Sequence, residues 1–188
     1  LSIESMYFFN DPQLSQQSNS STSLTFQPKY KQSWDFSKKV LDVQLFLREN
    51  ANDDERSHQD IRELSWSHSI DNFEYKVGIS KEFWGVAESY HLVDVINQLD
   101  NVEEVDFQSR LGQPMLKTSY FSDVGSFQAW VLPYFRERNF ASNKSRVFSG
   151  PVNIDEDAAE YYSSKKEKHV DYALRSSNNF NEYDVGLS

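Results

Sequence analysis

Three neighbouring acids are the first residues whose spacing could support chemistry. Glu103, Glu104 and Asp106 follow a segment with helical spacing and open one in which apolar residues alternate. On a strand, Glu104 and Asp106 would share one face, about 7 Å apart. Such a pair can hold a divalent cation or act as an acid–base pair, but it is also typical of a half-exposed strand. We favour the second interpretation, with all three acids forming a negative edge for a basic protein partner.

A second arrangement has the layout of a metal-dependent nuclease. Asp60 precedes Glu74 and Lys76, and that chemistry needs two carboxylates on Mg²⁺ and a lysine near the attacking water. No proline precedes Asp60, and the strand order inferred below differs from that of the nuclease core. Asp60 and Glu74 therefore remain an alternative metal site, with a solvated strand face as the competing interpretation.

Four basic residues cluster once in the chain, interleaved with phenylalanines. Such a grouping can hold single-stranded nucleic acid, although the end of a helix also favours basic residues. The alternative nucleic-acid-binding residues are Arg136, Arg138, Lys144 and Arg146.

Three tyrosines near the C-terminus form a candidate partner-binding group. Tyr161, Tyr162 and Tyr172 fall in a charged segment that we expect to be helical and exposed. Exposed aromatic residues are common anchors at protein interfaces.

Composition excludes several classes of chemistry. The chain has no cysteine and only six glycines. Thiolate metal sites, iron–sulfur clusters and glycine-rich phosphate loops are therefore excluded. No catalytic residue and no cofactor are predicted, and a binding role is favoured over an enzymatic one.

Net charge and hydropathy limit the kinds of partner that the chain is expected to bind. The formal net charge is −10 and the pI is about 4.8, which disfavours non-specific binding to a phosphate backbone. No apolar run approaches 18 residues, so neither a membrane-spanning helix nor a membrane partner is expected. The first residues show no basic region or cleavage pattern typical of a signal peptide. A cytoplasmic location is the expectation, with the oligomeric state left open.

Apolar periodicity predicts the secondary structure. In the clearest strand, Phe73, Tyr75, Val77 and Ile79 alternate with polar residues and are expected to face inward. Strands are predicted at 3–9, 38–48, 61–68, 72–79, 102–108, 115–121 and 145–154. Helices are predicted at 80–100, with Ser80 as N-cap; at 123–139, with Asp123 as N-cap; and at 155–175, where acids precede bases.

The order of elements from residue 72 is β-α-β-β-α-β, which predicts an α+β protein with a ferredoxin-like sandwich. Residues 38–154 would form this core, with additional antiparallel strands at its N-terminal side. Residues 1–37 would be a strand and a flexible polar arm, and residues 155–188 a charged helix and tail.

The function predicted from these features is that of a non-enzymatic, acidic protein-interaction module. An immunity or antitoxin-type inhibitor of a basic partner is one form of it. A structural subunit of a phage or secretion apparatus is a second hypothesis. A nucleic-acid-binding protein or metal-dependent nuclease is the third.

Overall fold

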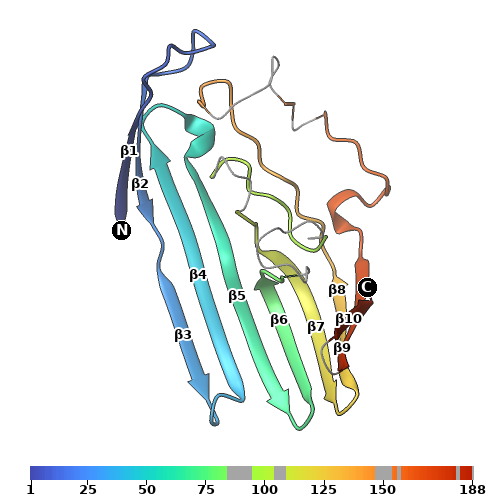
Figure 1. Ribbon diagram of the computed structural model, residues 1–188. Helices are drawn as coiled ribbons and strands as arrows, with labels where there is room; N and C mark the ends of the chain where they lie inside the picture. Colours follow the sequence, from blue (N-terminus) through green and yellow to red (C-terminus); the bar gives the residue numbers. More distant parts are fainter. Residues whose placement is uncertain (84–94, 104–108, 147–153, 156–157, 181–182, 188) are drawn as a thin grey trace.

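The computed structural model describes residues 1–83, 95–103, 109–146, 154–155, 158–180 and 183–187. Ten strands in these residues form one antiparallel sheet (Figure 1). Their bounds are β1 Ser2–Tyr7, β2 Ser20–Phe26, β3 Lys29–Trp34, β4 Lys39–Asn50, β5 His58–Ile70, β6 Phe73–Ser80, β7 Gln113–Ser122, β8 Gly125–Leu132, β9 Asp171–Phe180 and β10 Tyr183–Leu187. The described residues contain no α-helix, and two 3₁₀ turns lie wholly within them, η1 Asp54–Arg56 and η3 Lys166–Lys168.

Neighbouring strands in the sheet follow the chain order with one exception. The order is β1-β2-β4-β5-β6-β7-β8-β9-β10, and β3 pairs with β4 beside this path. The long strand β4 takes both partners, because residues 39–44 pair with β3 and residues 47–50 pair with β2.

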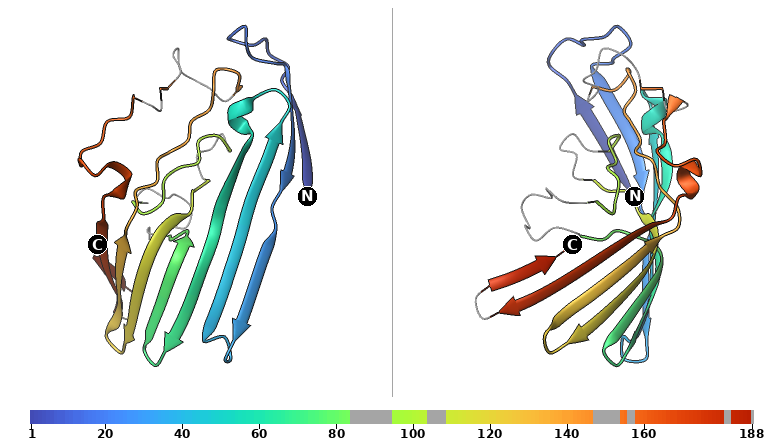
Figure 2. Two further views of the ribbon diagram at one scale, coloured as in Figure 1. Left: turned by 180° about the vertical axis from the view of Figure 1, so that it is seen from behind. Right: turned by 90° about the vertical axis from the view of Figure 1, so that its right-hand side faces the viewer.

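The two ends of the strands differ in their connections. At the lower end in Figure 1, tight turns join β3 to β4, β5 to β6 and β7 to β8. At the upper end, residues 81–112 and 133–170 make long excursions. The described part of residues 95–111 lies on the concave side of the curved sheet (Figure 2). We call this covered side the inner face and the opposite side the outer face.

The predicted ferredoxin-like α+β fold is wrong, because the sheet is built from strands alone and no helix packs on it. The expected helix at 123–139 is instead a turn followed by β8. Asp123 and Val124 form the turn, and Gly125 follows with φ +139°. A Cβ at Gly125 would lie 2.5 Å from the carbonyl oxygen of Ser177, so a glycine is required there. The apparent helical stripe arose because Phe127 and Trp130 are large residues on opposite faces of one strand.

The expected C-terminal helix at 155–175 is also wrong. The described part of this segment contains no α-helix: residues 160–165 are irregular, residues 166–168 form η3, and the end of the segment begins β9. Tyr172 and Leu174 alternate there with Ala173 and Arg175, which is strand periodicity. Residues 176–180 and 183–187, predicted to be a loose tail, belong to β9 and β10.

Of the helix predicted at 80–100, residues 84–94 lie outside the described residues. The described end, 95–100, is irregular and is fixed by Asn97. The side chain of Asn97 accepts from the Glu82 amide at 2.8 Å and donates to the carbonyl oxygens of Ser80 and Leu111 at 3.0 and 2.9 Å. These bonds satisfy backbone groups that a helix would have used internally.

The strands predicted at 3–9, 38–48, 61–68, 72–79 and 115–121 are confirmed, with longer bounds for several. Those at 102–108 and 145–154 lie largely outside the described residues. Residues 1–37 contribute β1, β2 and β3 to the sheet rather than forming a free arm.

The apolar core on the inner face is small. It consists of Ile96, Met115, Trp130 and Leu132, with Ala173 packed against it. No helix among the described residues has the length and apolar character needed to cross a membrane.

Candidate functional site

The polarity of the two faces is the reverse of that in a soluble sheet with one packed side. Two adjacent rows running across the strands show this. On the outer face, one row joins Leu41, Trp66, Val77, Leu116, Val131 and Tyr172. On the inner face, the next row joins Val40, Ser67, Lys76, Lys117, Trp130 and Ala173.

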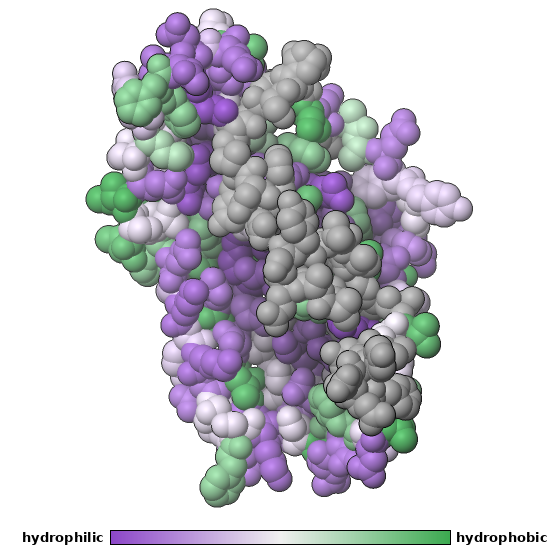
Figure 3. Space-filling view, viewed as in Figure 1, coloured by the Kyte–Doolittle hydropathy of each residue, from purple (hydrophilic) through white to green (hydrophobic). Residues whose placement is uncertain are grey.

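The inner face is covered but polar. Among the described residues, the largest side chains with less than 2% exposure are polar: Asp100, Ser23, Ser80 and Ser119. Viewed from this side, β4, β5 and β6 carry mainly hydrophilic residues (Figure 3). Buried polar groups cost free energy unless they are paired, so the inner face depends on an organised network.

Asp100 is the centre of that network. Its carboxylate is fully buried and lies 2.6 Å from Nη2 of Arg62. It also accepts from Nδ2 of Asn139 at 2.7 Å, and its Oδ2 lies 4.0 Å from Nε2 of His58. Arg62 Nε in turn lies 3.2 Å from Asp60, which also pairs with Arg136. Two connecting segments are thereby attached to β5 through buried charges.

Glu103 forms a second anchor beside it. Its side chain is 8% exposed, lies 2.9 Å from Nη2 of Arg48 and 3.5 Å from Nε2 of His58. Burial raises the pKa of Glu103 to about 7, against the opposing effect of Arg48. Burial lowers the pKa of His58, against the opposing effect of Asp100. Compared with the unfolded chain, the folded chain therefore binds a proton more tightly at Glu103 and less tightly at His58.

The network is balanced in charge. Its four arginines are Arg48, Arg56, Arg62 and Arg136, and its four carboxylates are Glu4, Asp60, Asp100 and Glu103. Among the described residues, no group of three or more His, Asp or Glu is placed to hold a metal ion. The nearby guanidinium groups also oppose a cation at Asp100 and Glu103. The arrangement therefore fits anchoring better than catalysis.

The outer face is apolar over six strands. Large side chains between 36% and 75% exposed are Leu45, Leu47, Leu64, Trp66, Ile70, Phe73, Tyr75, Val77, Leu116, Tyr120, Phe127, Tyr172 and Leu174. At these fractions and typical side-chain areas they expose on the order of 1,000 Å². Monomeric soluble proteins usually expose patches of about 300–600 Å². This outer apolar face is the strongest functional feature of the described residues.

The outer apolar face is most aromatic at its lower end. Beside the tight turns, register aligns Ile70, Phe73, Tyr120 and Phe127 across neighbouring strands. The ring centroids of Phe73 and Tyr120 lie 4.8 Å apart, and those of Tyr120 and Phe127 lie 6.5 Å apart. Further up the strands the row is mostly aliphatic, with Leu64 paired to Ile79 and Val43. Aromatic residues are thus most frequent beside the turns, and the mainly aliphatic band above them also contains Trp66 and Tyr172.

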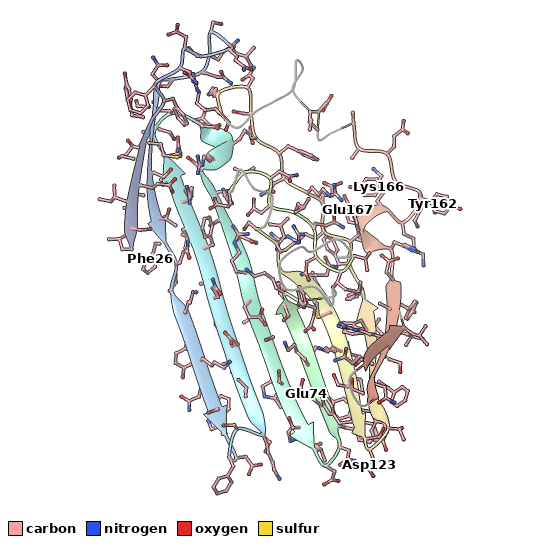
Figure 4. The ribbon with its side chains drawn as sticks, in the orientation of Figure 1. Phe26, Glu74, Asp123, Tyr162, Lys166 and Glu167 are labelled. Carbon is pink, nitrogen blue, oxygen red and sulfur yellow. The ribbon has the colours of Figure 1, made fainter. Side chains whose placement is uncertain are left out.

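The structure places the predicted acidic edge differently. Glu103 is buried in the network rather than solvent-facing, and Glu104 and Asp106 lie outside the described residues. The alternative metal pair is not brought together: Glu74 pairs in register with Ser69 at the lower end of β5, whereas Asp60 lies near its upper end. Figure 4 shows Glu74 low on β6.

The four basic residues predicted to contact nucleic acid all contact protein acceptors. Arg136 pairs with Asp60, Arg138 donates to Gln98 at 2.9 Å, and Lys144 lies 2.6 Å from Asp54. Arg146 donates to the carbonyl oxygen of Asn10 at 2.7 Å. These contacts join the segment after β8 to other parts of the chain and compete with binding of a phosphate.

The three C-terminal tyrosines do not form one surface. Tyr161 donates to Glu167 at 3.0 Å, Tyr162 is fully exposed, and Tyr172 belongs to the outer apolar face. Their expected common helix is absent from the described residues.

Sequence reasoning missed both the network and the reversed polarity. Arg48 lies on the same face of β4 as Phe46, and Arg62 lies on the same face of β5 as Asp60. The leucines of β4 lie on the opposite face. The available signal was that charged residues repeat on one side of strands whose other side is mainly apolar.

No protein-family model matches the chain, and no curated protein or solved structure is similar enough to it to count as a match. The function is therefore argued from the geometry.

Proposed function

We propose that the protein acts at a membrane, with its outer apolar face against the hydrocarbon region of a lipid bilayer and its inner face shielded from lipid. The observation that carries this proposal is the reversal of polarity across one sheet. An outer row of Leu41, Trp66, Val77 and Leu116 lies next to an inner row of Ser67, Lys76 and Lys117.

The distribution of charge supports lipid as the occupant. On the outer positions of β4 to β9, the formally charged residues among those described are Lys39 and Glu49. They lie at the two ends of β4, outside the aliphatic band. A protein interface would normally have a polar rim around its apolar centre on all sides. A hydrocarbon layer instead requires polar groups at its two boundaries only.

The dimensions and the aromatic row agree with this interpretation. From Ile61 to Ile70, β5 rises roughly 25–30 Å, close to the hydrocarbon thickness of about 30 Å. Tyr and Trp are enriched where hydrocarbon meets water. Tyr120 and Phe73 occupy such a boundary beside the turns, with Asp71 and Asp123 beyond them.

The proposal has a consequence at the sheet edges. Within the described residues, β1, β3 and β10 are each paired on one side only. Unpaired backbone groups are costly in hydrocarbon, so we expect these edges to take strand partners from a neighbouring chain in the lipid-bound state. Light scattering in detergent would report that association.

The sequence-based expectations of an acidic protein-interaction module in the cytoplasm, without a membrane partner, stay predictions. The observation that opposes them is the outer apolar face, because acidity at the surface does not explain it. A second copy or a partner protein on this face is the alternative that the experiment below separates.

The test uses two adjacent residues on opposite faces. The protein is refolded from urea with phosphatidylcholine vesicles and floated on a density gradient. Lysine in hydrocarbon costs about 2–4 kcal/mol, so Val77→Lys should lower vesicle binding at least about tenfold. Lys76→Val, on the inner face, should leave binding within about twofold of wild type.

Two results would overturn the proposal. One is wild-type protein that stays at the bottom of the gradient as a folded, stable dimer, which would assign the outer apolar face to a second copy. The other is equal flotation of Val77→Lys and wild type.

A further inference from the structure

A cavity of about 760 Å³ lies at the upper end of the outer apolar face. There β6 ends at Ser80 and β7 begins at Gln113, while β4 and β5 continue beyond them. The apolar wall of the cavity is formed by Leu45, Leu47, Ile61, Ile79 and Pro114. This wall is continuous with the aliphatic band below it.

The opposite side of the cavity is charged and net negative. Asp60, Arg136, Glu137 and Glu167 line it. Arg136 already binds protein acceptors: its Nη1 donates to the carbonyl oxygen of Gly112 at 2.9 Å, and its Nη2 pairs with Asp60. Because Arg136 neutralises Asp60, the net negative charge on this side of the cavity comes from the carboxylates of Glu137 and Glu167.

The polar side is held in position by main-chain contacts. The Phe135 amide donates to the carbonyl oxygen of Glu167 at 2.7 Å, and the Tyr134 carbonyl accepts from Gln113. Glu167 also accepts from Tyr161 at 3.0 Å. Figure 4 shows Glu167 on the segment that precedes β9. These contacts place an aromatic ring, Tyr134 at 43% exposure, in the same cavity as two carboxylates.

An ammonium group matches this chemistry. Carboxylates attract it by charge, and an aromatic face attracts it through the ring quadrupole. An anionic head would be repelled by Glu137 and Glu167. An alkyl chain attached to the ammonium would lie along Leu45, Leu47 and Ile61.

We propose that this cavity binds an amphiphile with an ammonium headgroup, the head at Tyr134, Glu137 and Glu167 and the alkyl chain on the upper end of the outer apolar face. The inference rests on the proposed function in taking a membrane lipid as the natural source of that amphiphile. The lysines that flank Glu167 in the sequence do not line the cavity.

The test is calorimetric titration of the whole protein in aqueous buffer with decyltrimethylammonium below its micelle concentration. The matched probes are decyl sulfate, which reverses the head charge, and tetramethylammonium, which lacks the chain. We expect saturable binding of decyltrimethylammonium at least about tenfold tighter than decyl sulfate, and no detectable binding of tetramethylammonium.

The matched variants are Glu137→Gln/Glu167→Gln and, as a control, Glu74→Gln on the distant lower part of β6. The double variant should bind the two decyl probes within about twofold of each other, and the control should retain the preference. No saturable binding of decyltrimethylammonium, equal affinity for both heads in wild type, or an unchanged preference in the double variant would overturn the inference. Because no vesicle is present, these results do not depend on whether the protein floats with lipid.

Discussion

The same strands form the outer and inner faces of this sheet, but the outer face is apolar and exposed whereas the inner face is mainly polar and covered. Trp66 and Trp130 illustrate the difference: Trp66 is 40% exposed on the outer face, and Trp130 is 3% exposed on the inner face. Trp130 packs with Met115 and Leu132, and Nζ of Lys117 lies 5.2 Å from its ring centre. Trp66 stands among Leu41 and Val77 with no covering element in the described residues.

The comparison teaches that burial and hydrophobicity are separable in this chain. The inner face is held by ion pairs and hydrogen bonds around a small core, so its integrity depends on a few charged residues. The outer face contributes less to folding in water than a packed face would, because its large side chains remain 36% to 75% exposed. Substitutions should therefore affect stability on one face and lipid association on the other.

The largest effect on stability is expected at Asp100. Asp100→Ala removes a fully buried carboxylate and leaves Arg62 without its 2.6 Å partner. Loss of one member of a buried pair costs about 3–5 kcal/mol. Urea unfolding monitored by circular dichroism measures this change.

The matched control is Asp42→Ala, which removes the pair with the exposed Lys31. An exposed pair contributes up to about 1 kcal/mol. Equal losses for the two aspartate variants would show that the inner network is not a special source of stability.

The next effect compares the two tryptophans. Trp130→Ala should lower the free energy of unfolding by about 3 kcal/mol, because it opens a cavity in the small core. Trp66→Ala should cost less than Trp130→Ala in water, because Trp66 is already 40% exposed and Trp130 only 3%. An equal or larger loss at Trp66 in the monomer would mean that the outer face is packed in solution.

The smallest effect is pH dependence at Glu103. Burial raises the pKa of Glu103 from its ordinary value of 4.5 to about 7, so the folded protein binds its proton more tightly than the unfolded chain. This contribution to the free energy of unfolding is present below pH 4.5 and is lost as the pH rises through 7. The lowered pKa of His58 acts in the opposite direction: its contribution is present above its ordinary value of 6.5 and is lost as the pH falls below that value and through the lower pKa of the folded state.

The difference between wild type and Glu103→Gln isolates the Glu103 contribution. Relative to wild type, Glu103→Gln should gain stability between pH 5 and pH 7.5, while Glu74→Gln should follow the wild-type profile. Parallel pH profiles for wild type and Glu103→Gln would contradict the buried position of this carboxyl.

Strand positions were predictable from the sequence where the alternation was clean. The segments at 38–48, 61–68, 72–79 and 115–121 alternate over several residues, and each is a strand. Segment 123–139 was misassigned because apolar residues occupy both faces of β8, which imitates a helical stripe. Residues 155–175 were misassigned because a charge gradient does not require a helix.

The orientation of the faces could not be predicted from alternation. A period of two says that Val77 and Lys76 lie on opposite sides, but not which side is covered. The usual assumption placed Val77 inward, and the structure places it at 48% exposure on the outer face. The Asp100–Arg62 pair was also beyond prediction, because its members come together only when the segment between β6 and β7 folds back over β5.

The most direct test of the central claim measures the depth of each tryptophan in lipid. Variants that retain only Trp66 or only Trp130, with the other tryptophans replaced by phenylalanine, are refolded with vesicles containing phosphatidylcholine brominated along its acyl chains. The account predicts strong bromine quenching of Trp66 and little quenching of Trp130. Equal quenching of the two, or quenching of neither, would contradict a lipid-facing outer surface.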